Sequence, residues 1–271
     1  MAHWIWGLGL AGAIAGVAYR ARALSRSGAV AAWVVGTVFF ACGGWWATGV
    51  LLAFFLPSSL LSALGRNRKA PLILEYAKGN ARDWGQVLAN GGAAAGVLLA
   101  MGKGLIPREW GCLFVTGALA AATADTWATE VGGLALTPRL ITTGRRVPRG
   151  TSGAISGLGV TASLLGGMWI GGVSALLLRW SPFGGNSLCR GDVLWWVAGL
   201  AGLSASLVDS WLGATVQRVY WCPHCEKETE RQIHRCGTPT LPLRGWSWCS
   251  NDVVNFIATL VGGIMAVTLG G

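Results

Sequence analysis

Charged side chains are scarce in this sequence. Only 12% of its 271 residues are Asp, Glu, Lys or Arg, whereas 53% are hydrophobic. A soluble domain normally carries about 25% charged residues, so the composition excludes an ordinary soluble protein and is typical of a membrane protein. Acidic residues are the scarcer kind, with 11 Asp and Glu against 21 Lys and Arg. In a membrane protein, basic loops and anionic lipid headgroups account for this excess, so nucleic acid is not an expected partner.

The sequence also lacks the pattern of a removable targeting segment. No basic residue precedes the first apolar stretch, residues 3–19, although a signal peptide would carry one there. A transit peptide rich in Arg and Ser is not evident either. We therefore expect residues 3–19 to remain as a first transmembrane helix, in a multi-pass protein of a prokaryotic plasma membrane.

Long apolar stretches predict an all-α, polytopic membrane protein with about eight transmembrane helices. One span needs about 20 residues, so the long apolar stretch 29–64 is divided in two at Gly43-Gly44. The predicted helices are 3–19, 29–44, 46–64, 85–102, 110–136, 154–178, 193–217 and 252–270. Residues 1–271 then form a single membrane domain, and 218–251 form its last cytoplasmic loop.

The positions of the basic residues support this number of helices. Eight helices place all but four of the 21 Lys and Arg residues on one side of the membrane. The exceptions are Lys103, Arg108, Arg179 and Arg190. The positive-inside rule assigns the basic side to the cytoplasm and both termini to the outside. Treating 29–64 as one helix would mix the basic loops between the two sides.

Polar residues gather near the cytoplasmic ends of the predicted helices. Asp125, Glu130 and Asp209 are carboxylates inside apolar stretches, where a charge costs about 2.5–3.5 kcal/mol at the helix centre. Asn90, Asn251 and Asn255 are expected at the same depth, as candidates to bind and orient the substrate or nucleotide. Helix capping and interhelical hydrogen bonds would explain the asparagines well. They explain three carboxylates poorly, so we predict that these carboxylates bind Mg²⁺.

The spacing of two carboxylates limits how they can share an ion. Asp125 and Glu130 are five residues apart, which places them about 140° apart around a regular helix. They can face one ion only if the helix unwinds, and Gly132-Gly133 offers a place for such a break.

The loop before residue 154 combines cations, glycines and hydroxyls with the start of a helix. Its candidate phosphate ligands are Arg145, Arg146, Gly150, Thr151, Ser152 and Gly153. Free N–H groups and the positive end of the helix dipole suit phosphate. The sequence is not a Walker A motif, and a capped loop that only obeys the positive-inside rule is the structural alternative. Lys69 and Arg82 are further phosphate candidates, with solvated loop charges as their alternative.

A cysteine cluster lies in the last predicted cytoplasmic loop. Cys222-Pro223-His224-Cys225 is followed by Cys236-Gly237, a spacing that resembles a zinc knuckle. The fourth ligand is left open among His234, His224 and Cys249. Structural Zn²⁺ would hold together a loop that is too short to form a core. A disulfide is less expected in a reducing cytoplasm, and no thioredoxin-like pattern surrounds the cysteines.

Four strings of residues, found in order along the chain, resemble the integral membrane family of domain of unknown function 92. They are ADTWATEVG at 124–132, GTSGAIS at 150–156, DSWLGATVQ at 209–217 and NDVVN at 251–255. Weaker matches are LSRSGA at 24–29 and FFLPSS at 54–59. The Cys-x-x-Cys insert departs from the simplest members of the family.

The resemblance implies a function, because the family includes the plant phytyl phosphate kinase. That enzyme converts an isoprenyl monophosphate to the diphosphate at the expense of a nucleoside triphosphate. More distant similarity to CTP-using lipid kinases and CDP-lipid synthases favours CTP. The resemblance thus implies a prenyl phosphate kinase with Mg²⁺, a nucleoside triphosphate, a prenyl monophosphate and membrane lipids as partners, and an active site that faces the cytoplasm. The alternatives are a transporter or flippase for a lipid phosphate, a cytidylyltransferase, and a scaffold without catalytic activity.

Overall fold

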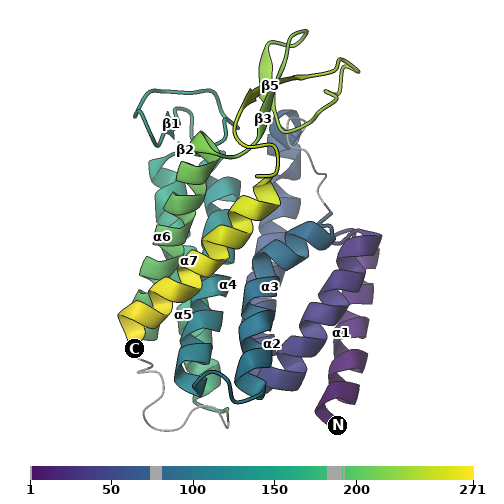
Figure 1. Cartoon of the computed structure of the whole chain (residues 1–271), viewed down its shortest axis with the longest axis vertical. Helices are drawn as coiled ribbons and strands as arrows, with labels where there is room; N and C mark the ends of the chain where they lie inside the picture. Colours follow the sequence, from purple (N-terminus) through teal and green to yellow (C-terminus); the bar gives the residue numbers. More distant parts are fainter. Residues whose placement is uncertain (1, 74–80, 182–190, 192) are drawn as a thin grey trace.

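The chain folds into a helical bundle with its short strands gathered at one end (Figure 1). The computed structural model describes residues 2–73, 81–181, 191 and 193–271, with side chains from residue 3 onward except in 66–73. The helices are α1 (Ala2–Arg20), α2 (Arg26–Ile73), α3 (Trp84–Gly102), α4 (Arg108–Gly132), α5 (Gly157–Leu178), α6 (Leu194–Thr215) and α7 (Asn251–Gly270). The strands are β1 (Arg139–Leu140), β2 (Ala154–Ile155), β3 (Val219–Cys222), β4 (Lys227–Thr229) and β5 (Leu241–Arg244).

Helix α2 folds back on itself at Gly44. This residue has φ 60° and ψ −153°, a backbone conformation that glycine adopts without the steric cost of a Cβ atom. Residues from both arms of α2, such as Val35 and Leu51, line one groove, which a straight helix could not do. The long apolar stretch is therefore two antiparallel spans, as the division at Gly43-Gly44 predicts.

The fold class predicted from the sequence is confirmed. Five helices are long and apolar enough to cross a membrane, and they include α2, which is counted once although it turns at Gly44. With α2 as two arms, the described residues contain eight helical segments. The two chain termini lie at the same end of the bundle, opposite the strands (Figure 1). An even number of crossings requires this arrangement.

We call the end that carries the strands the basic end. It holds Arg82 before α3 and the basic loops that connect α1 to α2, α4 to α5, and α6 to α7. Lys69, Lys78 and Arg190 lie outside the residues whose side chains are described. Exposed tryptophans occur near both ends, such as Trp45 at the turn of α2 and Trp246 after β5. Tryptophan prefers the two membrane–water interfaces, so this distribution fits a protein that spans the bilayer.

Small residues let the central helices approach closely. A Cβ atom added to Gly117 of α4 would lie 2.3 Å from the carbonyl oxygen of Gly262 in α7. One added to Gly167 of α5 would lie 2.6 Å from the carbonyl oxygen of Ala198 in α6. Close backbone contact of this kind is how membrane helices associate where lipid supplies no hydrophobic driving force. The packing fixes the ends of α4, α5, α6 and α7 relative to one another.

Two helix boundaries differ from the prediction and shape the site. Helix α4 ends at Gly132 instead of residue 136, and Gly133 follows as its C-cap. Helix α5 starts at Gly157 instead of residue 154, because Ser156 caps it by accepting a hydrogen bond of 3.1 Å from the N–H of Gly159. Residues 154–155, which the prediction had placed in the helix, instead form β2 and pair antiparallel with β1. Strands β4-β3-β5 form a second antiparallel sheet between α6 and α7.

Candidate functional site

A polar cleft opens at the basic end of the bundle. It has a volume of about 450 Å³ and is bounded by the ends of α2, α3, α4, α5, α6 and α7, the loop before β2 and the sheet β4-β3-β5. The sequence-predicted residues on its wall are Arg82, Asn90, Asp125, Glu130, Gly150, Thr151, Ser152, Gly153, Asp209, Asn251 and Asn255. Segments far apart in the chain therefore place most of the predicted site residues around one space.

Asp125 and Asp209 lie on two neighbouring helices. Asp125 is near the end of α4, Asp209 is near the end of α6, and both line the cleft. Each lies within electrostatic range of the other. The Oδ2 atom of Asp209 is buried and makes no hydrogen bond to the part of the protein that the structure describes. A buried carboxylate oxygen without a partner is costly, and a divalent cation between two carboxylates would remove that cost.

Glu130 belongs to a different part of the cleft. Helix α4 continues without a break to Gly132, so Glu130 stays on a different face of the helix from Asp125. Its Oε1 accepts a hydrogen bond of 2.9 Å from the hydroxyl of Ser62 in α2, and its charge acts on Arg82. Among the described residues, the three carboxylates do not form one metal-ligand cluster. The structure thus brings Asp125 to Asp209, and Glu130 to Ser62 and Arg82.

The loop before β2 is held against the end of α6. The hydroxyl of Ser152 lies 3.0 Å from the carbonyl oxygen of Gly213 and 3.1 Å from Oε1 of Gln217. Gly153 has φ +82°, and an added Cβ atom would lie 2.5 Å from the backbone nitrogen of Ala214. Glycine is therefore required there both by the backbone conformation and by the close approach of α6.

The cations of this loop divide between the cleft and the solvent. Arg145 and Arg146 are exposed and do not line the cleft, whereas Arg149 does. The sequence interpretation did not select Arg149, although its position directly before Gly150 was a usable signal. Lys69, the other predicted phosphate ligand, lies outside the residues whose side chains are described.

Several further lining residues were missed by the sequence interpretation. They are Ser62, Gln86, Ser206, Gln217, Glu228 and Glu230. Neutral Ser and Gln side chains carry no distinctive signal in a membrane helix, because they also serve as interhelical hydrogen-bond partners. Glu228 and Glu230 lie in a polar loop, where charged residues are expected without any site.

Four side chains in the loop between α6 and α7 gather into a metal-ligand cluster. The ligand atoms of Cys222, Cys225, His234 and Cys236 all lie within 4.8 Å of one another. Sγ of Cys236 is 3.7 Å from Sγ of Cys222 and 3.2 Å from Nδ1 of His234. His234 is thus the residue that completes the set that the sequence left open. Cys249 is outside the cluster.

The electrostatics of this cluster favour one thiolate in advance of any metal. Hydrogen bonding to Thr238 and then to His234 lowers the pKa of Cys236 to about 5. Partial burial and the neighbouring thiols raise the pKa of Cys225 to about 11. Thiolate is the form of cysteine that binds a metal. Three sulfur atoms and one imidazole nitrogen match the tetrahedral donor set of structural zinc sites.

Hydrogen bonds connect the sheet that carries the cysteine cluster to the cleft. Nε2 of Gln217 donates a hydrogen bond of 2.8 Å to Oε1 of Glu230, next to β4. Nη1 of Arg244 in β5 lies 3.2 Å from Oε1 of Glu228, and its Nη2 donates to the carbonyl oxygen of Ser152 at 3.3 Å. The sheet therefore supports the phosphate-candidate loop from the side that faces away from the membrane core.

A known family of membrane proteins matches almost the whole of this chain. The model of the family described as integral membrane protein DUF92 matches residues 9–263. The chain belongs to this family. It is similar to Protein PGR of Arabidopsis thaliana, with 32% identity over 90% of this chain and 88% of that protein. It is also similar to an uncharacterized membrane protein of Methanocaldococcus jannaschii, with 29% identity over 92% of this chain and 87% of that protein.

A further plant relative is named Protein VTE6, chloroplastic. It is 28% identical over 91% of this chain and 65% of that protein. The relatives in Arabidopsis overturn the predicted location in a prokaryotic plasma membrane, because one of them is a chloroplast protein by name. The multi-pass membrane character of the prediction stands. No solved structure matches this chain.

Proposed function

We propose that this protein is an isoprenyl phosphate kinase, with CTP as the expected donor. A phosphate oxygen of a prenyl monophosphate would attack the γ-phosphorus of the nucleotide, and the bond from that phosphorus to the β–γ bridging oxygen would break. The products would be a prenyl diphosphate and the nucleoside diphosphate. One observation carries the proposal, namely that two neighbouring, partly buried carboxylates, Asp125 and Asp209, share a cleft with the loop 149–153.

Asp125 and Asp209 are the residues that would hold Mg²⁺. The buried, unpartnered Oδ2 of Asp209 and the nearby charge of Asp125 fit a hard cation that prefers oxygen ligands. When bound, Mg²⁺ would neutralise the charge on the phosphates that it contacts. Glu130 interacts with Ser62 and Arg82, so we assign it to the orientation of Arg82 instead of to direct metal binding.

The phosphates would be held by groups on two sides of the cleft. The loop 149–153 offers the guanidinium of Arg149 and backbone N–H groups. The hydroxyl of Thr151 donates to the carbonyl oxygen of Pro148 at 2.9 Å and would have to turn to reach a phosphate. Arg82 faces the cleft from the opposite side, before α3. Phosphoryl transfer needs chiefly positioning and neutralisation of charge. Cations on both sides would let the two phosphate-bearing substrates meet near the aspartates.

We also propose that Zn²⁺ holds the loop between α6 and α7 through Cys222, Cys225, His234 and Cys236. The support is the convergence of their ligand atoms within 4.8 Å. A metal is a usual way to stabilise a segment of this size, because fewer than about 40 residues rarely bury enough apolar surface to be stable alone. Its role would be to keep β3, β4 and β5 in place beside the cleft.

The direct test is an assay of the purified protein in detergent. Labelled CTP, ATP, GTP and UTP are each supplied with Mg²⁺ and prenyl monophosphates of several lengths, and the products are separated by chromatography. Transfer of the label from the γ-position to a prenyl diphosphate is the expected result. Transfer of the nucleoside monophosphate part instead would identify a cytidylyltransferase. If no pair of substrates gives a product, and the reconstituted protein moves prenyl phosphate across the membrane of vesicles, the protein is a flippase and the kinase proposal is wrong.

A further inference from the structure

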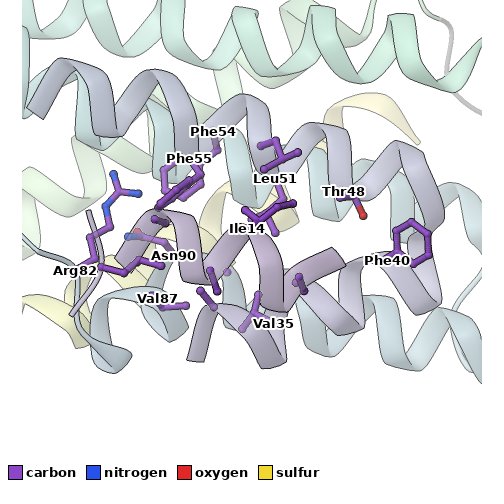
Figure 2. A pocket seen from close by; sticks show the side chains of 18 of the residues that line it. Ile14, Val35, Phe40, Thr48, Leu51, Phe54, Phe55, Arg82, Val87 and Asn90 are labelled. Carbon is purple, nitrogen blue, oxygen red and sulfur yellow. The ribbon is translucent and has the colours of Figure 1, made fainter. Parts of the chain in front are cut away.

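An apolar groove runs between α1, the two arms of α2, and α3. Its wall is formed by aliphatic and aromatic side chains, among them Ile14, Val35 and Leu51 (Figure 2). Thr48, Arg82, Gln86 and Asn90 are the polar side chains on it. Helix α1 forms one side of the groove and packs mainly against α2. The groove therefore lies at the edge of the bundle, next to the lipid.

The groove is continuous with the polar cleft. Arg82, Gln86 and Asn90 line both spaces. Figure 2 shows Arg82 and Asn90 towards one end of the groove and Phe40 towards the other. Phe40 is close in sequence to the turn at Gly44, at the opposite end of the bundle from Arg82. The groove thus extends from the cleft into the membrane-spanning part of the protein.

Arg82 is fixed at the junction of the two spaces. Its backbone N–H donates to the carbonyl oxygen of Ala23 at 3.0 Å, and its own carbonyl oxygen accepts from Ser25 at 3.0 Å. Its guanidinium carbon lies 5.1 Å from the ring centroid of Phe54 and 5.5 Å from that of Phe55. These contacts place a cation against the aromatic wall of the groove while it still faces the cleft.

The charge of Arg82 persists at this junction. Burial lowers the pKa of its guanidinium to about 10, and the charge of Glu130 acts in the opposite direction. A pKa of about 10 leaves the side chain protonated at neutral pH. An anion at the junction would therefore meet a permanent, partly desolvated cation, a strong environment for a phosphate.

We infer that this groove binds the hydrocarbon chain of the prenyl monophosphate, with the phosphate beside Arg82 at the mouth of the cleft. The inference rests on the proposed function, and it identifies where the lipid part of the substrate lies. An apolar channel that ends at a fixed cation matches an amphiphile with one anionic end. The direction also matches, because the headgroup is at the membrane surface and the chain points toward Gly44.

Crosslinking can test the inference independently of catalysis. The purified protein, in nanodiscs of ordinary phospholipid, is mixed with a prenyl monophosphate that carries a diazirine at the far end of its chain. After irradiation, peptides are mapped by mass spectrometry. Labelling of α1 and of the α2 arms near Phe40, abolished by excess unlabelled prenyl monophosphate, is the expected result. Labelling confined to the outer faces of α5 and α6, or labelling of the groove that the competitor leaves unchanged, would overturn it.

A substitution with a matched control sharpens this test. Ala15 of α1 is buried and lines the groove, whereas Ala13 of the same helix is exposed and does not. Ala15→Phe is expected to reduce competitor-sensitive crosslinking at least fivefold, and Ala13→Phe is expected to leave it within twofold. Equal crosslinking in both variants would contradict the inference. If Ala15→Phe fails to fold, as judged by size exclusion, Leu51→Ala should shift the labelled positions along the groove, and unchanged positions would contradict it.

The same variants distinguish failure of the inference from failure of the proposed function. Phosphoryl transfer together with label outside the groove would support the kinase activity and refute the groove as the binding site of the prenyl chain. Competitor-sensitive label in the groove, without phosphoryl transfer to any substrate, would support the groove as a lipid phosphate site and refute the proposed kinase activity.

Discussion

The side-chain amide of Gln217 donates a hydrogen bond of 2.8 Å to Glu230, which joins the end of α6 to the loop that follows β4. Glu230 also lies within electrostatic range of Asp209. The cysteine cluster begins at the end of β3, the strand that pairs with β4. Anything that disorders the sheet would therefore disturb the surroundings of Asp209, although the cluster itself lies outside the cleft.

Loss of two cysteines should remove the metal. Cys222→Ser together with Cys225→Ser takes two of the four ligands away, so zinc content is expected to fall from about one ion per chain to near zero. Metal analysis of protein purified without chelator is the measurement. Cys249→Ser is the matched control, because Cys249 is a buried cysteine near the same sheet but outside the cluster. Wild-type protein without zinc would refute the site, and zinc lost equally in the control would refute the ligand assignment.

Gly153→Ala should loosen the loop that we assign to phosphate binding. The added Cβ atom would lie 2.5 Å from the backbone nitrogen of Ala214, so the loop has to move away from α6. Gly144→Ala is the control, because Gly144 also has a positive φ but an added Cβ atom meets nothing within 4 Å. The shared backbone strain costs about 1–2 kcal/mol. We expect a higher KM for the nucleotide only in Gly153→Ala, measured at saturating prenyl monophosphate; equal KM values would show that the loop does not hold the nucleotide.

Arg82→Gln tests the cation at the junction of cleft and groove. The KM for prenyl monophosphate is expected to rise about tenfold or more, which corresponds to about 1.4 kcal/mol of binding. The KM for the nucleotide should change less. Arg26→Gln is a suitable control, since Arg26 is an exposed arginine at the same end of the bundle and interacts with Tyr19. If only the KM for the nucleotide rises, Arg82 binds the nucleotide and not the phosphate of the prenyl substrate.

The hairpin in α2 makes a prediction about membrane topology. Because eight helical segments cross the bundle, an epitope tag after Gly271 and one inserted at Gly144 should lie on opposite sides of the membrane. Sealed vesicles treated with protease would show protection of one tag and cleavage of the other. Cleavage of both tags in intact vesicles would mean that one segment fails to cross.

The sequence predicts features that depend on local composition. Apolar length and the pair Gly43-Gly44 were sufficient to place two antiparallel spans in 29–64, because a helix much longer than the bilayer must turn or leave it. The spacing of Cys222, Cys225 and Cys236 indicated a metal cluster, and the distribution of polar residues along the helices indicated a common depth.

Features that depend on packing between distant segments were not predictable. The spacing of Asp125 and Glu130 predicts that they lie on different faces of α4. Only the hydrogen bond from Ser62 shows that Glu130 faces α2. Arg149 lines the cleft while Arg145 and Arg146 do not, since the turn before β2 decides which side chain points inward. The apolar groove is formed by three helices whose surfaces look like ordinary lipid-facing residues in the sequence.

The two aspartates provide the sharpest test of the proposed mechanism. Asp125→Asn and Asp209→Asn keep the side-chain size and remove one charge, so the packing of α4 and α6 should survive. Each is expected to lower Mg²⁺-dependent turnover by about 10²-fold or more, the scale of losing a key electrostatic group. Turnover is measured against Mg²⁺ concentration, with size-exclusion behaviour as the check on folding.

The control is Glu109→Gln, which makes the same chemical change in the first turn of α4, at the end of the bundle away from the cleft. It should leave turnover and Mg²⁺ dependence unchanged, because no phosphate approaches that end. The effects of Asp125→Asn and Asp209→Asn should not add in the double variant, since either loss alone leaves one carboxylate where the ion needs two. A double variant no worse than the single ones therefore supports a shared ion. A folded Asp125→Asn or Asp209→Asn variant with near-normal turnover would instead make that aspartate a structural residue and remove it from the metal site.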